Sequence, residues 1–217
     1  MTFENLDNSL SSQILRWMQA NKFNIFTGEK RYNIIYIEGL NADGKVNADR
    51  PNEFNDRRMI IEIVDDHPKI IGNWEATTEP GDYYTIHPMN TRGAARIAFG
   101  QYQAWQVGHH GSRDVHEALI QVAPVKVWRD YNKDYKRTGD FLDNGLFGIN
   151  QHWGYDLPVT KVYNASAGCL VGRSRASHRL FMELCKRDLR YVENKKYIFW
   201  TTIIPGDKLL KQFPIQS

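Results

Sequence analysis

The chain has 217 residues, of which 41% are hydrophobic and 24% are charged, and its formal net charge is +3. This length and balance suit one globular domain with a sizeable core and exclude an intrinsically disordered protein. Lys and Arg residues are scattered, which argues against nucleic acid as a partner. No apolar run approaches the roughly 18 residues that a membrane span requires, which argues against a membrane partner.

The chain begins with a segment that predicts a helix. Leu10, Ile14, Trp17 and Met18 recur at helical spacing within residues 9–22, so we expect an amphipathic helix in an N-terminal extension over residues 1–30. The first twenty residues start acidic and contain no continuous apolar region, which is untypical of a secretory signal. We therefore expect a chain that is cytoplasmic at synthesis.

Residues 31–217 are predicted to form one mainly β domain. Runs of β-branched and aromatic residues separated by Gly, Pro, Asn and Asp are typical of strands, and the turn at residues 65–68 joins two of them as a hairpin. The exception is a helix over residues 174–191, where Leu180, Phe181 and Leu184 form an apolar stripe with Cys185. The expected strands cover residues 33–38, 59–64, 69–78, 82–86, 95–107, 118–122, 125–131, 146–151, 168–172 and 196–203.

One segment, residues 148–173, carries a combination of residues that suits nucleophilic catalysis. It contains His152 and, seventeen positions later, Cys169. A thiol attacks a carbonyl at neutral pH when a nearby imidazole takes its proton. Small residues precede the thiol, so a substrate can approach the backbone there, and N–H groups of Gly168 and Cys169 can stabilise an oxyanion.

These residues resemble the catalytic motif of the L,D-transpeptidase (YkuD-like) family, a His followed by Ser/Thr-His-Gly-Cys. Ser166, Gly168 and Cys169 match it, and His152 stands fourteen positions before the serine. Upstream, the stretch IIGNWEATTEPGDYYTI is similar to the family's Thr-Pro-x-Gly-x-Tyr region. The resemblance covers about residues 58–204, and it departs from the family at Ala167, where the motif has His.

The resemblance implies an L,D-transpeptidase-like β-sandwich or barrel with one long helix after the catalytic Cys. It also implies a nucleophile at Cys169, a base at His152 and an oxyanion donor at Gly168. Attack on a peptidoglycan stem peptide would give a thioester, which an amine converts to a cross-link and water hydrolyses. No metal or cofactor is implied. We expect substrate contacts from Ser166, Arg173, Trp153 and Tyr84.

A phage-type endolysin acting at the cell wall fits this hypothesis, and two alternatives stay open. Ala167 would mark a degraded site if the chain were a non-catalytic wall-binding module. The segment HHGSRDVH predicts a polar loop beside the cleft, but its His109, His110 and His116 are also residue types that hold zinc in hydrolases. Cys185, on the apolar stripe of the predicted helix, is expected in the core, and two cysteines are too few for a disulfide framework.

Overall fold

The computed structural model describes residue 3, residues 6–137 and residues 141–215. The structure is mainly β, with 35% of the described residues in strands and 20% in helices, which confirms the expected mainly β class. Residues 1–2 and 4–5 of the predicted N-terminal extension lie outside the described residues. Among the described residues, no helix has the length and apolar character that crossing a bilayer requires.

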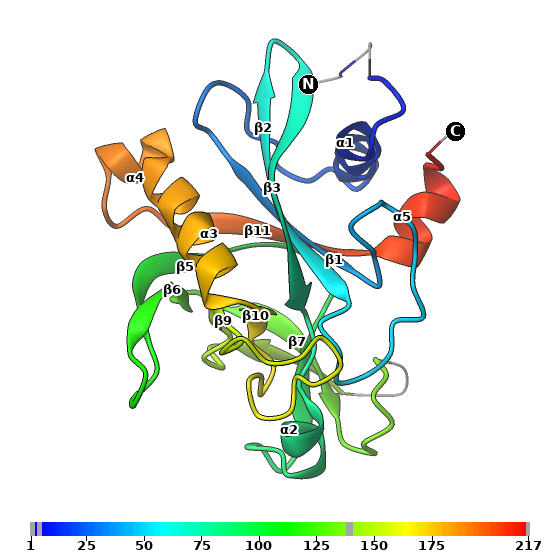
Figure 1. Ribbon diagram of the computed structural model, residues 1–217, viewed down its shortest axis with the longest axis vertical. Coiled ribbons are helices and arrows are strands. Elements are labelled where there is room, and N and C mark those ends of the chain that lie inside the picture. Colours follow the sequence, from blue (N-terminus) through cyan, green and yellow to red (C-terminus); the bar gives the residue numbers. More distant parts are fainter. Residues whose placement is uncertain (1–2, 4–5, 138–140, 216–217) are drawn as a thin grey trace.

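Within the described residues, eight strands close into a barrel in the order β1-β11-β5-β6-β9-β10-β3-β2 (Figure 1). Neighbouring strands pair antiparallel, except that β1 pairs parallel with β11 and β9 pairs parallel with β10. The strands are β1 (Asn33–Glu38), β2 (Asp56–Val64), β3 (His67–Thr77), β5 (Gly100–His110), β6 (His116–Gln121), β9 (Gln151–Trp153), β10 (Leu170–Gly172) and β11 (Phe199–Pro205).

The continuous apolar run of β1 follows from burial on both of its faces. Ile34 and Tyr36 belong to one core cluster, whereas Ile35 and Ile37 belong to a second cluster that includes residues of the N-terminal helix. Because successive side chains of a strand point to opposite faces, a strand covered on both sides needs apolar residues at every position. The predicted strand over residues 33–38 is confirmed.

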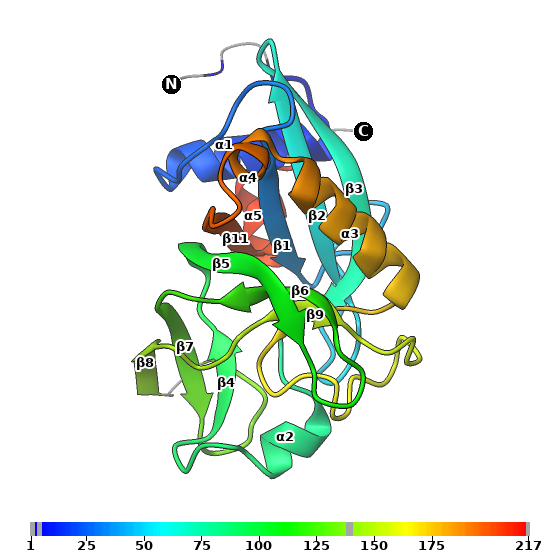
Figure 2. The same cartoon turned by 90° about the vertical axis from the view of Figure 1, so that its left-hand side faces the viewer.

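A second, three-stranded sheet lies beside the barrel in the order β4 (Ala94–Ile97), β7 (Val125–Asp130), β8 (Phe141–Gly145), as Figure 2 shows. Its strand β4 carries Arg96, whose guanidinium is fully buried. Arg96 pairs with Asp130 of β7, where Nε lies 3.2 Å from a carboxylate oxygen, and with Glu79. Arg137 joins Glu79 to Glu38 at the end of β1. This buried network connects the smaller sheet to the barrel.

The N-terminal helix, α1 (Leu10–Ala20), confirms the predicted amphipathic helix. It begins at Ser9, whose hydroxyl accepts the Ser12 N–H at 3.3 Å. Its apolar face buries Ile14, Leu15 and Met18 against barrel residues in the second core cluster. In Figure 1 it lies near α5 (Gly206–Gln212), a C-terminal helix that the sequence analysis did not anticipate.

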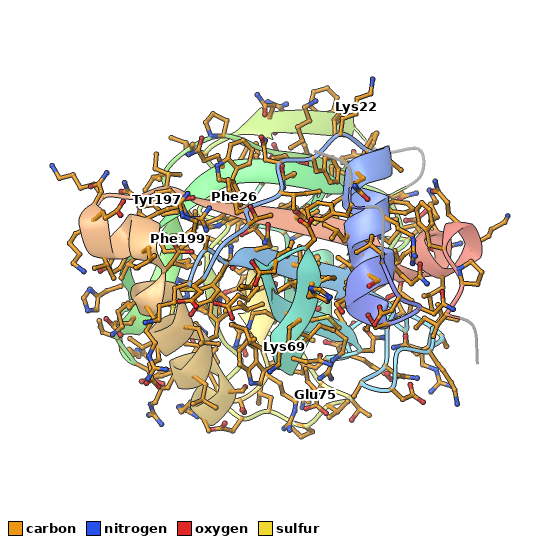
Figure 3. All side chains as sticks on the ribbon, turned by 90° about the horizontal axis from the view of Figure 1, so that it is seen from above. Lys22, Phe26, Lys69, Glu75, Tyr197 and Phe199 are labelled. Carbon is orange, nitrogen blue, oxygen red and sulfur yellow. The ribbon has the colours of Figure 1, made fainter. Side chains whose placement is uncertain are left out.

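The predicted helix over residues 174–191 divides in two, α3 (Arg175–Arg187) and α4 (Leu189–Glu193). The break falls at Asp188, whose backbone is not helical (φ −58°, ψ 126°) and whose carboxylate accepts the Tyr32 N–H at 2.9 Å. Arg190 then places its guanidinium over the rings of Phe26 and Tyr197, 4.2 and 4.9 Å from their centroids. Figure 3 shows Phe26, Tyr197 and Phe199 on the same side of the molecule as α4.

Three predicted strands are wrong in part or whole. Residues 82–86 form a short helix, α2 (Asp82–Ile86), because Gly81 begins a turn in which the Thr85 N–H donates to the Gly81 carbonyl at 3.0 Å. The run over residues 95–107 is divided between β4 in the smaller sheet and β5 in the barrel.

Residues 146–150 form no strand in the described structure, and β9 begins at Gln151. The backbone N–H groups of Phe147 and Ile149 donate instead to the side-chain oxygen of Gln121, at 3.0 and 2.9 Å. A side-chain amide therefore takes the place of a neighbouring strand.

Candidate functional site

The parallel pairing of β9 and β10 brings His152 and Cys169 to one face of the sheet. Val171 is the register partner of His152, so the two side chains point the same way. Cys169 lies immediately before β10 and shares a buried apolar cluster with Val171, which places it on the same side. The imidazole and the thiol both line the cavity on this side of the sheet.

A tight turn made by Ser166 and Gly168 presents Cys169 to this face. The Ser166 hydroxyl donates to the Cys169 carbonyl at 2.9 Å and accepts the Gly168 N–H at 3.1 Å. Gly168 has a φ of +128°, and a Cβ at this position would lie 2.5 Å from the carbonyl oxygen of Ala95. The turn therefore requires glycine.

The sulfur of Cys169 is largely enclosed, with the residue 9% exposed. Its S–H donates to the Gly148 carbonyl and its sulfur accepts the Asn150 N–H, both at 3.4 Å. Burial raises the pKa of the Cys169 thiol to about 11, against a smaller lowering by the Asn150 N–H. The Cys169 thiol is therefore protonated at neutral pH, and no hydrogen bond joins it directly to His152 in the described structure.

His152 is held as a neutral imidazole. Its Nδ1 lies 2.7 Å from the Trp153 carbonyl, and burial, with a smaller contribution from nearby His110, places the pKa of His152 well below its usual value. Because a carbonyl only accepts, Nδ1 carries the proton and Nε2 keeps its lone pair. The lone pair on Nε2 can accept a proton, and the Trp153 carbonyl orients the ring.

Both residues line one cavity of about 640 Å³ between the barrel, the smaller sheet and α2. Tyr84 of α2 also lines it, as the sequence analysis expected of a substrate-contacting residue. Ala167, at the position where the family motif has His, lies on the wall as well. Further lining residues are Met89, Asn90, Ala95, His110, Arg129, Phe147, Ile149, Tyr155 and Asn164.

Three other predicted substrate contacts are absent from the cavity wall that the described residues form. Ser166 is buried, with its hydroxyl committed to the Cys169 turn. The Trp153 ring stacks on His116, with centroids 3.8 Å apart. Arg173, the residue after β10, forms an ion pair with Glu75 of β3. These three side chains lie outside the cavity wall and contact other protein residues.

The oxyanion donors predicted from the sequence need one correction. The N–H of Gly168 is already bonded to the Ser166 hydroxyl, so it is not free for a substrate oxygen. The N–H of Cys169 makes no hydrogen bond to the described residues. One of the two expected backbone donors is therefore available.

The histidines proposed as zinc ligands do not form a ligand set. His109 and His110 are consecutive on β5 and point to opposite faces, and His109 is exposed. The rings of His110 and His116 are 5.6 Å apart, and the Nδ1 atom of each already has a hydrogen-bond partner. Among the described residues, no group of three or more His, Cys, Asp or Glu side chains is placed to hold a metal ion.

Asn150 organises the site and was not predicted from the sequence. Its Oδ1 accepts the Gln121 N–H at 2.8 Å, its Nδ2 approaches Nδ1 of His110 at 3.0 Å, and its backbone N–H donates to Cys169. The sequence offers one signal for it, its place two residues before His152. Its contacts depend on β6 and β9 being neighbours, which only the fold shows.

Cys169 and Cys185 are both free thiols, as expected. Cys185 is buried in the first core cluster among apolar side chains, and burial strongly raises the pKa of its thiol.

Comparisons with known proteins found no match to any family model, any curated protein or any solved structure.

Proposed function

We propose that the chain is a cysteine-dependent acyl-transfer enzyme of the L,D-transpeptidase type that acts on peptidoglycan stem peptides at the bacterial cell wall. The observation that carries the proposal is the placing of His152 and Cys169 on one face of paired strands and on the wall of one cavity. This placing supports the proposal, because a base and a nucleophile must reach the same bound substrate.

The chemistry starts from a neutral pair. His152 removes the proton of Cys169 as the sulfur attacks the substrate carbonyl, and the protonated imidazole then delivers that proton to the leaving amine. The product is a thioester on Cys169. A raised thiol pKa and a lowered imidazole pKa disfavour a resting ion pair, so proton transfer accompanies the attack.

The substrate class rests on the motif of Ser166, Gly168 and Cys169 and on its spacing from His152. The mainly β architecture and the helix that follows the Cys are compatible with it. The cavity accommodates a peptide segment, since ligand sites commonly have volumes of about 300–1,000 Å³. Tyr84 and Tyr155 supply aromatic walls. A hydrolase of the endolysin kind is the form of the activity that we propose.

The proposal is tested by incubating the protein with purified sacculi and measuring released muropeptides. Cys169→Ala is expected to abolish release, and His152→Ala to slow it by about 10²–10⁴-fold, the usual contribution of a general base. Cys185→Ala is the matched control, because it removes the other thiol from the core and leaves the cavity untouched. It should release muropeptides at the wild-type rate once folding is verified.

Two results would contradict the proposal. Binding to sacculi without release, unchanged by Cys169→Ala, would indicate a wall-binding module. Release that stops with a chelator and continues in Cys169→Ala would indicate a metal-dependent hydrolase.

A further inference from the structure

A second imidazole, that of His110, lines the same cavity as His152 and Cys169. Its ring is stacked on the His152 ring, with centroids 3.9 Å apart and planes inclined by 11°. His110 stands at the end of β5, opposite His116 of β6, and is partly buried. The acyl-transfer chemistry described above gives it no role.

Hydrogen bonding fixes where the proton of His110 sits. The Asn150 side chain is oriented by its Oδ1, which accepts the backbone N–H of Gln121 at 2.8 Å. Its Nδ2 therefore donates to Nδ1 of His110, 3.0 Å away. Nδ1 of neutral His110 is an acceptor, so the proton is on Nε2.

The two stacked rings are thus opposite tautomers. His152 has its proton on Nδ1, bonded to the Trp153 carbonyl, and offers a lone pair at Nε2. His110 has its Nδ1 occupied by Asn150 and offers an N–H at Nε2. One ring can accept a proton while the other donates a hydrogen bond.

Electrostatic repulsion keeps His110 neutral while His152 is protonated. Burial and the neighbouring His116 lower the pKa of His110, and burial and His110 lower that of His152. Two cationic rings at this separation would repel each other strongly in a partly buried site. When His152 carries the proton taken from Cys169, His110 therefore stays a neutral N–H donor.

The site also lacks a second hydrogen-bond donor for the substrate oxyanion, and the Nε2–H of His110 can supply it. The N–H of Gly168 is bonded to Ser166, and Ala167 on the cavity wall has no side-chain donor. The carbonyl oxygen gains negative charge as the sulfur attacks, and one backbone N–H, that of Cys169, is left for it.

We propose that His110 is a second catalytic residue, whose neutral Nε2–H donates a hydrogen bond to the carbonyl oxygen of the scissile bond while His152 removes the Cys169 proton. The inference rests on the proposed function. In the step, the C–S bond forms, the carbonyl π electrons move to oxygen, and the thiol proton moves to His152. The oxyanion then reforms the carbonyl, the C–N bond breaks, and the amine leaves with the proton from His152. His110 keeps its own proton throughout.

The test compares His110→Ala, His110→Gln and His109→Ala in two assays, muropeptide release and alkylation of Cys169 by iodoacetamide. Alkylation needs the thiol but has no oxyanion. We expect His110→Ala to lower kcat by about 10²–10³-fold, the usual loss for one oxyanion donor, with KM and the alkylation rate within about twofold of wild type. His110→Gln keeps an N–H donor and should recover at least tenfold of the lost kcat. His109→Ala, on the exposed face of the same strand, should match wild type.

The proposal is overturned if His110→Ala turns over substrate like an active wild type, which would leave the proposed function intact. It is also overturned if His110→Ala slows alkylation as much as turnover, because His110 would then act through the thiol. If His110→Ala fails to fold, His110→Gln decides, and a folded His110→Gln as inactive as Cys169→Ala contradicts the donor role. A wild type that releases nothing refutes the proposed function, and this inference with it.

Discussion

The turn that presents Cys169 can be tested by adding one methyl group at Gly168. At a φ of +128°, an L residue is strained, and its Cβ would lie 2.5 Å from the Ala95 carbonyl oxygen and 3.1 Å from Ile149 Cδ1. The backbone strain costs about 1–3 kcal/mol, and forcing the contact apart costs about 1–3 kcal/mol more. Gly168→Ala should therefore lower the free energy of unfolding by about 2–6 kcal/mol.

Gly148→Ala is the matched control. Gly148 has a φ of +73°, but a Cβ there meets no atom within 4 Å, so it bears the backbone cost alone, about 1–2 kcal/mol. Urea denaturation followed by tryptophan fluorescence measures both variants. If Gly168→Ala is no less stable than Gly148→Ala, the close approach of this turn to β4 is wrong, and with it the proposed placing of the thiol.

Three further outcomes are expected. Arg96→Met removes the guanidinium that pairs with buried Asp130 and Glu79 and should cost about 3–5 kcal/mol in urea denaturation, whereas Arg187→Met, from an exposed ion pair, should cost no more than about 1 kcal/mol. Burial and a neighbouring guanidinium lower the pKa of His178 from 6.5 to about 2. The unfolded chain therefore takes up this proton first, so stability falls as the pH drops below 6.5. At pH 4.5 His178 should lower the free energy of unfolding by about 3 kcal/mol. A His178→Gln variant that loses as much stability as wild type between pH 6.5 and pH 4.5 would contradict this. With a pKa of about 11 against an ordinary 9.0, Cys169 should react with iodoacetamide at pH 7.5 about a hundredfold more slowly than free cysteine, and faster as pH rises. Cys185 should stay unmodified in the folded protein, and its labelling alongside Cys169 would contradict its place in the core.

Local signals in the sequence were sufficient where one element decides its own structure. The Asp65-Asp66 turn has both residues at positive φ, +47° and +64°, and it joins β2 to β3 as predicted. Such residues tolerate the left-handed conformations that a tight hairpin requires. The N-terminal helix was likewise predicted from the helical spacing of its apolar residues.

Prediction failed where distant parts of the chain decide the local structure. Residues 146–151 have a strand composition, but Gln121, 26 and 28 residues away from Phe147 and Ile149, takes their N–H groups. The helix after Cys169 ends early because Asp188 bonds the backbone of Tyr32, which is 156 residues away. Neither contact can be predicted from the local pattern of apolar and polar residues.

The candidate site divides in the same way. Cys169 and His152 were identified from residue type and spacing, because the motif lies within one short segment. His110 was noticed as one of a polar group in the sequence, but its stacking on His152 needs β5, β6 and β9 to be neighbours in the barrel. Arg173 and Trp153 were expected on the cavity because Arg173 lies close in sequence to Cys169 and Trp153 lies next to His152, but neither lines the cavity.

The most direct test of the proposed mechanism is to quench the protein in acid while it turns over a stem-peptide substrate. The mass of the protein is then measured, and peptide mapping locates any added group. The account predicts an acyl adduct on Cys169, labile to hydroxylamine as a thioester is, and absent in Cys169→Ala. Turnover without an adduct at Cys169, or with the acyl group on another residue, would contradict it.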